Sequence, residues 1–144
     1  MKYKNPLPTV DSIISKQNKI VLIRRGNRPF RGKLALPGGY IDHFETAEHA
    51  AVREAKEETG LQIKLNCILG VYSEPKRDPD KHTMSTVFIA KSFSGKLKGG
   101  DDATEAGWFD LKKLKPSELA FDHFKIIRDF IKWKKNNETY WSTK

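Results

Sequence analysis

The chain has 144 residues, of which 38% are apolar, a composition typical of globular proteins that excludes a disordered chain. Its length suits one domain with a proper core and is too short for two of usual size, so residues 1–144 are expected to form a single domain. The single cysteine, Cys67, excludes an internal disulfide, and no apolar run is long enough for a membrane span, which predicts a soluble, cytoplasmic protein.

The first part of the chain is expected to form strands. Residues 9–14 and 19–24 are apolar-rich runs separated by a polar, turn-prone stretch, a pattern that predicts a hairpin. Because residues 20–23 are apolar at every position, the second run is expected to be a central strand buried on both faces. Arg24 and Arg25 follow at its end, either as a solvated strand end or as contacts to phosphate.

A helix of about a dozen residues is expected next, because its start and stop signals are both present. Thr46 offers a hydroxyl to cap the helix start, Glu48 places an acid in the first turn, and Gly60 supplies a left-handed stop. The sequence therefore predicts a helix between Thr46 and Gly60.

Three carboxylates lie on one face of this helix, because Glu54, Glu57 and Glu58 are spaced i, i+3 and i+4. Like charges at this spacing cost roughly 0.2 to 0.5 kcal/mol per pair, and Arg53 can relieve only part of that. The cluster is either a solvated face or a cation site, and carboxylate oxygens would select Mg²⁺ or Mn²⁺.

The second half is expected to alternate strands and loops, in this order: one bent or two successive strands at 62–73, a polar loop at 74–82, a central strand at 83–92, a turn at 94–102 and a short strand at 105–109. An amphipathic helix is expected from about residue 118 to residue 135, with its apolar stripe in the core. The tail from Asn136 is expected either to fray or to form a dimer contact.

Charge is distributed unevenly along the chain. Between Gly39 and Leu61 six acidic residues stand against two basic ones, although the net charge of the chain is +9. An acidic notch in a basic body suits a metal site that receives an anionic substrate. Nucleic acid is not the expected partner, because the basic residues are scattered and form no recognisable binding motif.

The acidic notch has a diagnostic spacing. Five residues separate Gly39 from Glu45, seven separate Glu45 from Arg53, and the chain then continues REAKEETGL to Leu61. This resembles the Nudix box at every fixed position. The lead-in RRGNRPFRGKLALPGGYID and the later segments YSEPKRDPDKH, GDDATEAGWFDL and LAFDHFKII resemble ADP-ribose pyrophosphatase-like Nudix proteins. The resemblance implies an α/β (α+β) Nudix fold, with a mixed β-sheet sandwiched between α-helices.

The same resemblance implies roles for the box residues. Glu54 and Glu58 are the expected Mg²⁺ ligands, with Mn²⁺ as a substitute, and Glu57 is either a further ligand or shares a second ion. The Gly38 carbonyl is expected to complete the metal site. Arg53 is expected to support catalysis by pairing with Glu57 or with Glu45, the box acid that anchors the loop to the helix.

The general base is expected outside the box. Its candidates are Asp101, Asp102 and Glu105, each of which is otherwise a turn-forming or solvated acid, and Glu57 is next in line. Arg77 with the neighbouring Asp78 is expected to hold the diphosphate and the terminal sugar, or else to form only a salt-bridged turn.

Three hypotheses of function remain open at this stage. The first is Mg²⁺-dependent hydrolysis of a nucleoside diphosphate linked to another group, with ADP-ribose giving AMP and ribose 5-phosphate. The second keeps the mechanism but uses a nucleoside triphosphate or a dinucleoside polyphosphate. The third is a sensor that binds ADP-ribose without cleaving it. In all three the partner is a small-molecule nucleotide.

Overall fold

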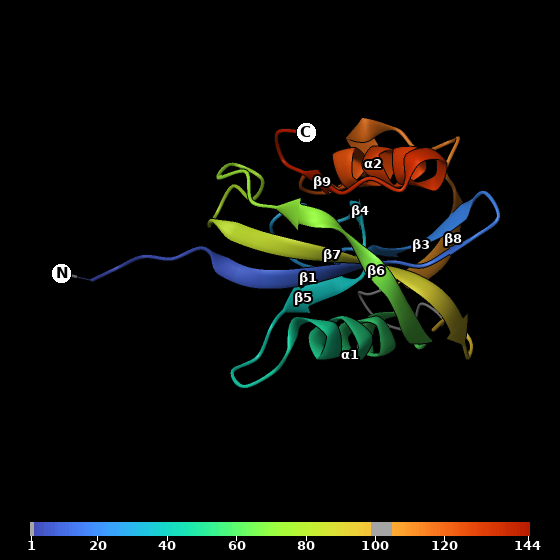
Figure 1. The fold of residues 1–144 in the computed structure, drawn as a ribbon, viewed down its shortest axis with the longest axis horizontal. Coiled ribbons are helices and arrows are strands. Elements are labelled where there is room, and N and C mark those ends of the chain that lie inside the picture. Colours follow the sequence, from blue (N-terminus) through green and yellow to red (C-terminus); the bar gives the residue numbers. More distant parts are fainter. Residues whose placement is uncertain (1, 99–104) are drawn as a thin grey trace.

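The computed structural model describes residues 2–98 and 105–144 (Figure 1). Its elements follow the chain in this order: β1 (Leu7–Ile13), β2 (Ser15–Lys16), β3 (Lys19–Arg24), β4 (Leu34–Ala35), β5 (Gly38–Tyr40), α1 (Ala47–Thr59), β6 (Gln62–Tyr72), β7 (Thr83–Ser94), β8 (Glu105–Asp110), the 3-10 turn η1 (Pro116–Glu118), α2 (His123–Asn136) and β9 (Tyr140–Trp141).

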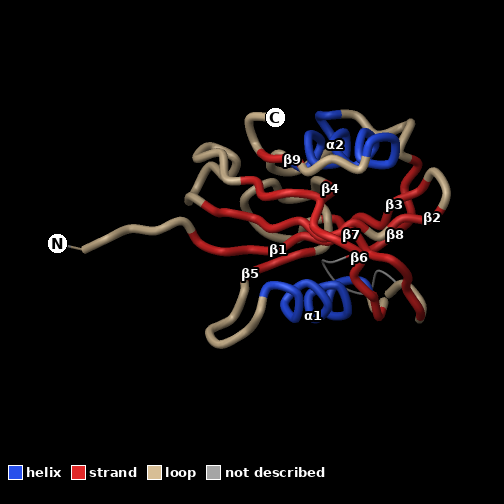
Figure 2. The backbone as a smooth tube through the Cα atoms, viewed as in Figure 1, coloured by secondary structure: helices blue, strands red, loops and turns tan. Residues whose placement is uncertain are grey.

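The strands form two sheets, and the helices lie on opposite sides of them (Figures 1 and 2). One sheet has the order β5-β1-β7-β6-β9, and in the other β3 pairs with β2, β4 and β8. Pairing is mixed, because β1 lies parallel to β7 but antiparallel to β5. The expected α+β class and the mixed sheet between helices are confirmed.

The expected hairpin is wrong in its first arm. Strand β1 pairs with β5 and β7, and only the short β2 turns back onto β3. The physical reason is burial, because an interior position in the larger sheet covers Val10 and Ile13 completely. The central position of β3 is confirmed, since Ile20, Val21 and Leu22 are fully buried.

Helix α2 begins five residues later than expected. The 3-10 turn η1 ends at Glu118, Leu119 forms an isolated bridge with Leu34, and Phe121 has a left-handed φ of 52°. These contacts position the chain between η1 and His123, where α2 starts. The start of α2 is therefore set by a contact with β4, which is distant in the chain. The spacing of apolar residues along a helix carries no information about such a contact.

The apolar stripe of α2 is confirmed as core. Ile126, Ile127 and Phe130 are buried against both sheets in the main hydrophobic cluster, whereas Ile131 is 37% exposed. Asp129 on the same face accepts a hydrogen bond of 2.8 Å from the Tyr72 hydroxyl, which ties α2 to β6. No helix within the described residues is long and apolar enough to cross a membrane.

The expected fraying of the tail is wrong. Residues Tyr140 and Trp141 form β9, which pairs in parallel with Gly70 and Val71 of β6. Tyr140 is only 3% exposed, so the tail covers the edge of its own sheet. A dimer contact through the tail stays a prediction.

Candidate active site

Helix α1 carries the acidic face of the site, and both of its ends match the sequence signals. The Thr46 hydroxyl accepts a hydrogen bond of 3.1 Å from the His49 amide, and Gly60 has a φ of 81°. The face turned to the sheet carries small buried residues, Ala50, Ala51 and Ala55, which let the helix axis lie close to the strands.

Arg53 connects the carboxylates of this helix to the loop before it. Its Nε and Nη2 donate to the two carboxylate oxygens of Glu45 at 2.7 and 2.8 Å. Its Nη1 donates to Glu54 at 2.9 Å and to Glu57 at 3.3 Å. The hydrogen bonds from Arg53 hold the pKa of Glu45 well below its usual range. Arg53 thus contacts both of the acids that the sequence suggested as its partners.

Glu58 lies deeper than the other two box acids. Its Oε1 accepts a hydrogen bond of 2.7 Å from the Gly38 amide, so the helix is attached to β5 at this point. Burial raises the pKa of Glu58 to about 8, and burial also raises the pKa of Glu54. The Glu57 side chain is 57% exposed.

The donor chemistry of this helix face fits a hard divalent cation, because every candidate ligand is an oxygen. A cation would relieve the cost of burying the carboxylates of Glu54 and Glu58 so close to each other. Within the described residues, however, no three acids or histidines stand close enough together to form a ready metal cluster. The side chains of Glu54 and Glu57 turn to Arg53, and Glu58 turns to the Gly38 amide.

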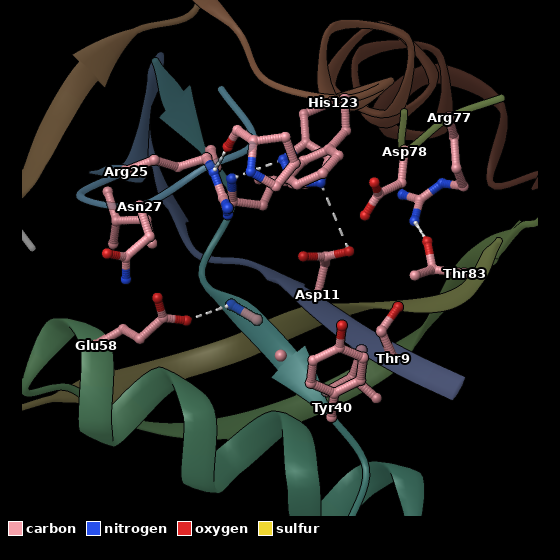
Figure 3. A pocket seen from close by; sticks show the side chains of 18 of the residues that line it. Thr9, Asp11, Arg25, Asn27, Tyr40, Glu58, Arg77, Asp78, Thr83 and His123 are labelled. Atoms are coloured by element: carbon pink, nitrogen blue, oxygen red, sulfur yellow. Dashed lines mark hydrogen bonds and ion pairs between the residues drawn. The ribbon is translucent and has the colours of Figure 1, made fainter. Parts of the chain in front are cut away.

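A cavity of about 320 Å³ adjoins Glu58 (Figure 3). It lies between β1, β5, the loop that follows β3, and the start of α2, and the residues that define it here are Asp11, Arg25, Gly38, Glu58, Arg77 and His123. The box acid Glu58 therefore lies between the acidic helix face and this cavity.

Comparison with known proteins identifies the family. A model of the NUDIX domain matches residues 6–130 of this chain. The chain belongs to the Nudix family. It is 56% identical over 132 residues to an ADP-ribose pyrophosphatase of Methanocaldococcus jannaschii, a match that covers 92% of this chain and 77% of the relative.

Solved Nudix structures have the same fold. The NUDIX domain of Shewanella oneidensis NrtR, in complex with ADP ribose, superposes with a TM-score of 0.81 at 26% identity and covers 92% of this chain and 91% of that one. A MutT NUDIX hydrolase from Burkholderia pseudomallei gives a TM-score of 0.78 at 28% identity, covering 88% of this chain and 98% of its own.

Of the neighbouring Arg24 and Arg25, Arg25 lines the cavity, as Arg28 of the same loop does, and Arg24 does not. The Arg25 Nε donates to the Pro29 carbonyl at 2.7 Å, and its guanidinium lies 4.8 Å from the centre of the Phe121 ring. Arg24 instead donates to the Gly32 carbonyl at 2.9 Å. These bonds direct the two neighbouring side chains to different places.

Arg77 and Asp78 both line the cavity, but they do not pair with each other. Arg77 donates to both carboxylate oxygens of Asp122, at 3.0 and 2.7 Å, and to the Thr83 hydroxyl at 2.7 Å. Asp78 accepts a hydrogen bond of 2.8 Å from the Asp80 amide. Burial alone would lower the pKa of Arg77, but the Asp122 carboxylate outweighs it and the pKa is raised. The segment that contains Arg77 and Asp78 is more than a local salt-bridged turn, because Arg77 joins this loop to the start of α2.

Two of the three candidate bases, Asp101 and Asp102, lie outside the described residues. The third, Glu105, is the exposed first residue of β8, in register with Arg24. The assignment of the base therefore stays a prediction.

Two buried, titratable residues of the cavity were not predicted from the sequence. Asp11 is 7% exposed and His123 is 3% exposed, and the His123 Nε2 lies 3.7 Å from the Asp11 Oδ2. Burial raises the pKa of Asp11 to about 7 and lowers the pKa of His123 to about 3. A charged residue inside an apolar strand could have indicated Asp11, whereas the sequence around His123 gives no comparable signal.

Proposed function

We propose that this Nudix protein hydrolyses ADP-ribose to AMP and ribose 5-phosphate with the help of Mg²⁺, and that residues 1–144 act as one Nudix hydrolase domain. The observation that carries the proposal is the position of Glu58, which joins the acidic face of α1 to a cavity of about 320 Å³. The 56% identity to an ADP-ribose pyrophosphatase supports ADP-ribose as the substrate.

In the proposed site, Glu54, Glu57, Glu58 and the Gly38 carbonyl hold the divalent ion. A bound Mg²⁺ would neutralise charge on the diphosphate and provide an activated water for the attack. The protein's own contribution is orientation, because the Arg53 contacts fix the directions in which the carboxylates point.

The remaining residues act on the substrate. Arg25 lines the cavity on the side of Glu58 and is placed to face a phosphate, and Arg28 of the same loop lines the cavity as a second cation. Glu105 or one of the acids outside the described residues accepts the proton of the attacking water.

The deciding experiment is a panel of substrates with Mg²⁺ and with Mn²⁺, with products identified by mass. ADP-ribose should give AMP and ribose 5-phosphate with a higher kcat/KM than ATP or a dinucleoside polyphosphate. A matched pair of variants controls for the charge of α1: Glu58→Gln should abolish turnover, whereas Glu48→Gln, at an exposed position of the same helix, should not change it.

Two results would contradict the proposal. A higher kcat/KM on a nucleoside triphosphate would assign the site to the second hypothesis. Tight binding of ADP-ribose without any product, in the presence of either metal, would identify a sensor.

A further inference from the structure

The cavity contains a buried carboxyl group for which the proposed chemistry has no use. Asp11 lies in the middle of β1, directly opposite Gly38 of β5, and only 7% of its surface is exposed. In Figure 3 its side chain points into the cavity. An apolar side chain would suit a buried strand position better, because a buried carboxyl group needs hydrogen-bond partners to offset its lost hydration.

One oxygen of this carboxyl group is held by the protein. The Ser85 hydroxyl donates to Asp11 Oδ2 at 2.5 Å, and His123 Nε2 lies 3.7 Å from the same oxygen. Because His123 Nδ1 accepts the Leu36 amide at 3.0 Å and burial keeps the ring neutral, its proton lies on Nε2 and faces Asp11. The Ser85 hydrogen bond orients the carboxyl group through Oδ2, and the His123 ring lies next to the same oxygen.

The other oxygen is left for a ligand. Asp11 Oδ1 lies against the α-carbon of Gly38, in space that a β-carbon on residue 38 would occupy. No hydrogen bond from the described residues reaches this oxygen. It is an acceptor on the wall of the cavity, held in a fixed direction by the contacts of Oδ2.

Its partner must be a hydrogen-bond donor that lies close to the diphosphate. A phosphate suits this acceptor less well than a hydroxyl group does, because an ionised carboxylate and a phosphate repel each other. Glu58 and Arg25 line the same cavity as Asp11, so a substrate with its phosphates beside Glu58 brings its next chemical group toward Asp11. In ADP-ribose that group is a ribose on either side of the diphosphate.

The polar groups around Asp11 suit a sugar. Two aromatic rings of the cavity carry a cation on one face: the Arg25 guanidinium lies 4.8 Å from the centre of Phe121, and the Lys81 ammonium lies 5.0 Å from the centre of Tyr40, which is 43% exposed. Hydroxyl groups need only acceptors and donors, which Asp11 and its polar neighbours supply.

The arginine first expected to help hold the terminal sugar is already engaged. All three nitrogens of the Arg77 guanidinium donate to Asp122 or Thr83, whereas Asp78, like Asp11, has one carboxylate oxygen bonded and one without a hydrogen bond from the described residues. Asp11 is thus an acceptor of the cavity in addition to Asp78.

We propose that Asp11 Oδ1 accepts a hydrogen bond from a hydroxyl of the terminal ribose, which makes Asp11 a specificity-determining residue. This inference rests on the proposed hydrolysis of ADP-ribose. It explains why an acceptor is buried in β1 and why its Oδ2 is held by Ser85 next to His123.

The test measures binding of uncleavable α,β-methylene analogues by calorimetry in Mg²⁺ buffer. Asp11→Asn should weaken the ADP-ribose analogue by about ten- to a hundredfold, as expected for loss of a hydrogen bond to a charged group. The analogue of ADP, which lacks the terminal ribose, should change by less than about twofold. Asp11→Ala should show the same difference between ligands, and thermal melting checks that each variant is folded.

Three outcomes overturn the assignment. The first is that neither ligand binds more weakly to the variant, and the second is that both ligands are weakened equally. The third is that the weakening caused by Asp11→Asn disappears only when hypoxanthine replaces adenine in the ligand, which would assign Asp11 to the base. Turnover of ADP-ribose by the unmodified protein separates this failure from failure of the proposed function. A protein that cleaves ADP-ribose but shows one of these outcomes loses only the Asp11 assignment, whereas one that neither binds nor cleaves ADP-ribose loses both.

Discussion

Removing one partner of the ion pair between Arg77 and Asp122 should lower the stability of the protein strongly. The Arg77 side chain is 4% exposed and that of Asp122 is 17% exposed, so loss of Asp122 leaves a buried guanidinium without its ion-pair partner, and loss of Arg77 leaves a partly buried carboxylate. Such a loss costs about 3 to 5 kcal/mol. For a protein of this size, each kcal/mol lowers Tm by roughly 3 °C, so Arg77→Met or Asp122→Leu should each lower Tm by about 10 °C.

The assay is a double-mutant cycle followed by thermal and urea unfolding. The double variant Arg77→Met/Asp122→Leu should be more stable than either single variant, because it leaves neither charge buried alone. Single losses below about 1 kcal/mol, or a double variant whose loss equals the sum of the two, would refute the view that the two residues act as a buried unit. The Thr83 hydroxyl loses its donor in every variant that lacks Arg77, so the cycle must be compared with Arg77→Met/Thr83→Val.

The remaining predictions concern turnover and acid stability. Glu58→Gln, or a chelator, should lower turnover by orders of magnitude while circular dichroism stays unchanged, and full activity in either case would remove Glu58 from the proposed metal site. Glu105→Gln should lower kcat more than it raises KM, as expected for a group that acts in the transition state; an unchanged kcat would exclude it as the base. Because the pKa of His123 is about 3 in the folded protein and 6.5 in a free chain, the unfolded state binds more protons at this residue between these values, and the His123 contribution to stability should fall as pH drops below about 6.5. The raised pKa values of Asp11 and Glu58 act in the opposite direction, so the variant isolates the His123 contribution. His123→Asn should reduce this dependence in urea unfolding at a series of pH values, and an unchanged slope would contradict the buried, neutral state of the ring.

The sequence predicted the box helix well because the signals for it are local. The cap at Thr46, the stop at Gly60 and the spacing of the carboxylates all act within one or two helical turns, and α1 runs from Ala47 to Thr59 as expected. The approximate positions of most strands followed in the same way, from short runs of apolar residues.

The parts that were missed depend on residues far apart in the chain. Asp11 and Ser85 are 74 residues apart, and Arg77 and Asp122 are 45 residues apart. Neither contact leaves a periodic pattern in the sequence. The same holds for β1, which pairs with β7 although Leu7 and its partner Thr83 are far apart in the chain.

The two glycines of β5 are needed for their small volume and not for backbone freedom. Side chains alternate along a strand, so a β-carbon on Gly38 would strike the Val10 carbonyl and the Asp11 carboxyl group on one side, and a β-carbon on Gly39 would strike the Glu54 carboxyl group on the other. The backbone of β5 thus lies between two acids, with Asp11 on one side and Glu54 on the other. An alanine at either place would press on only one side of it, so Gly38→Ala and Gly39→Ala should disturb different acids although the two residues are adjacent in the chain.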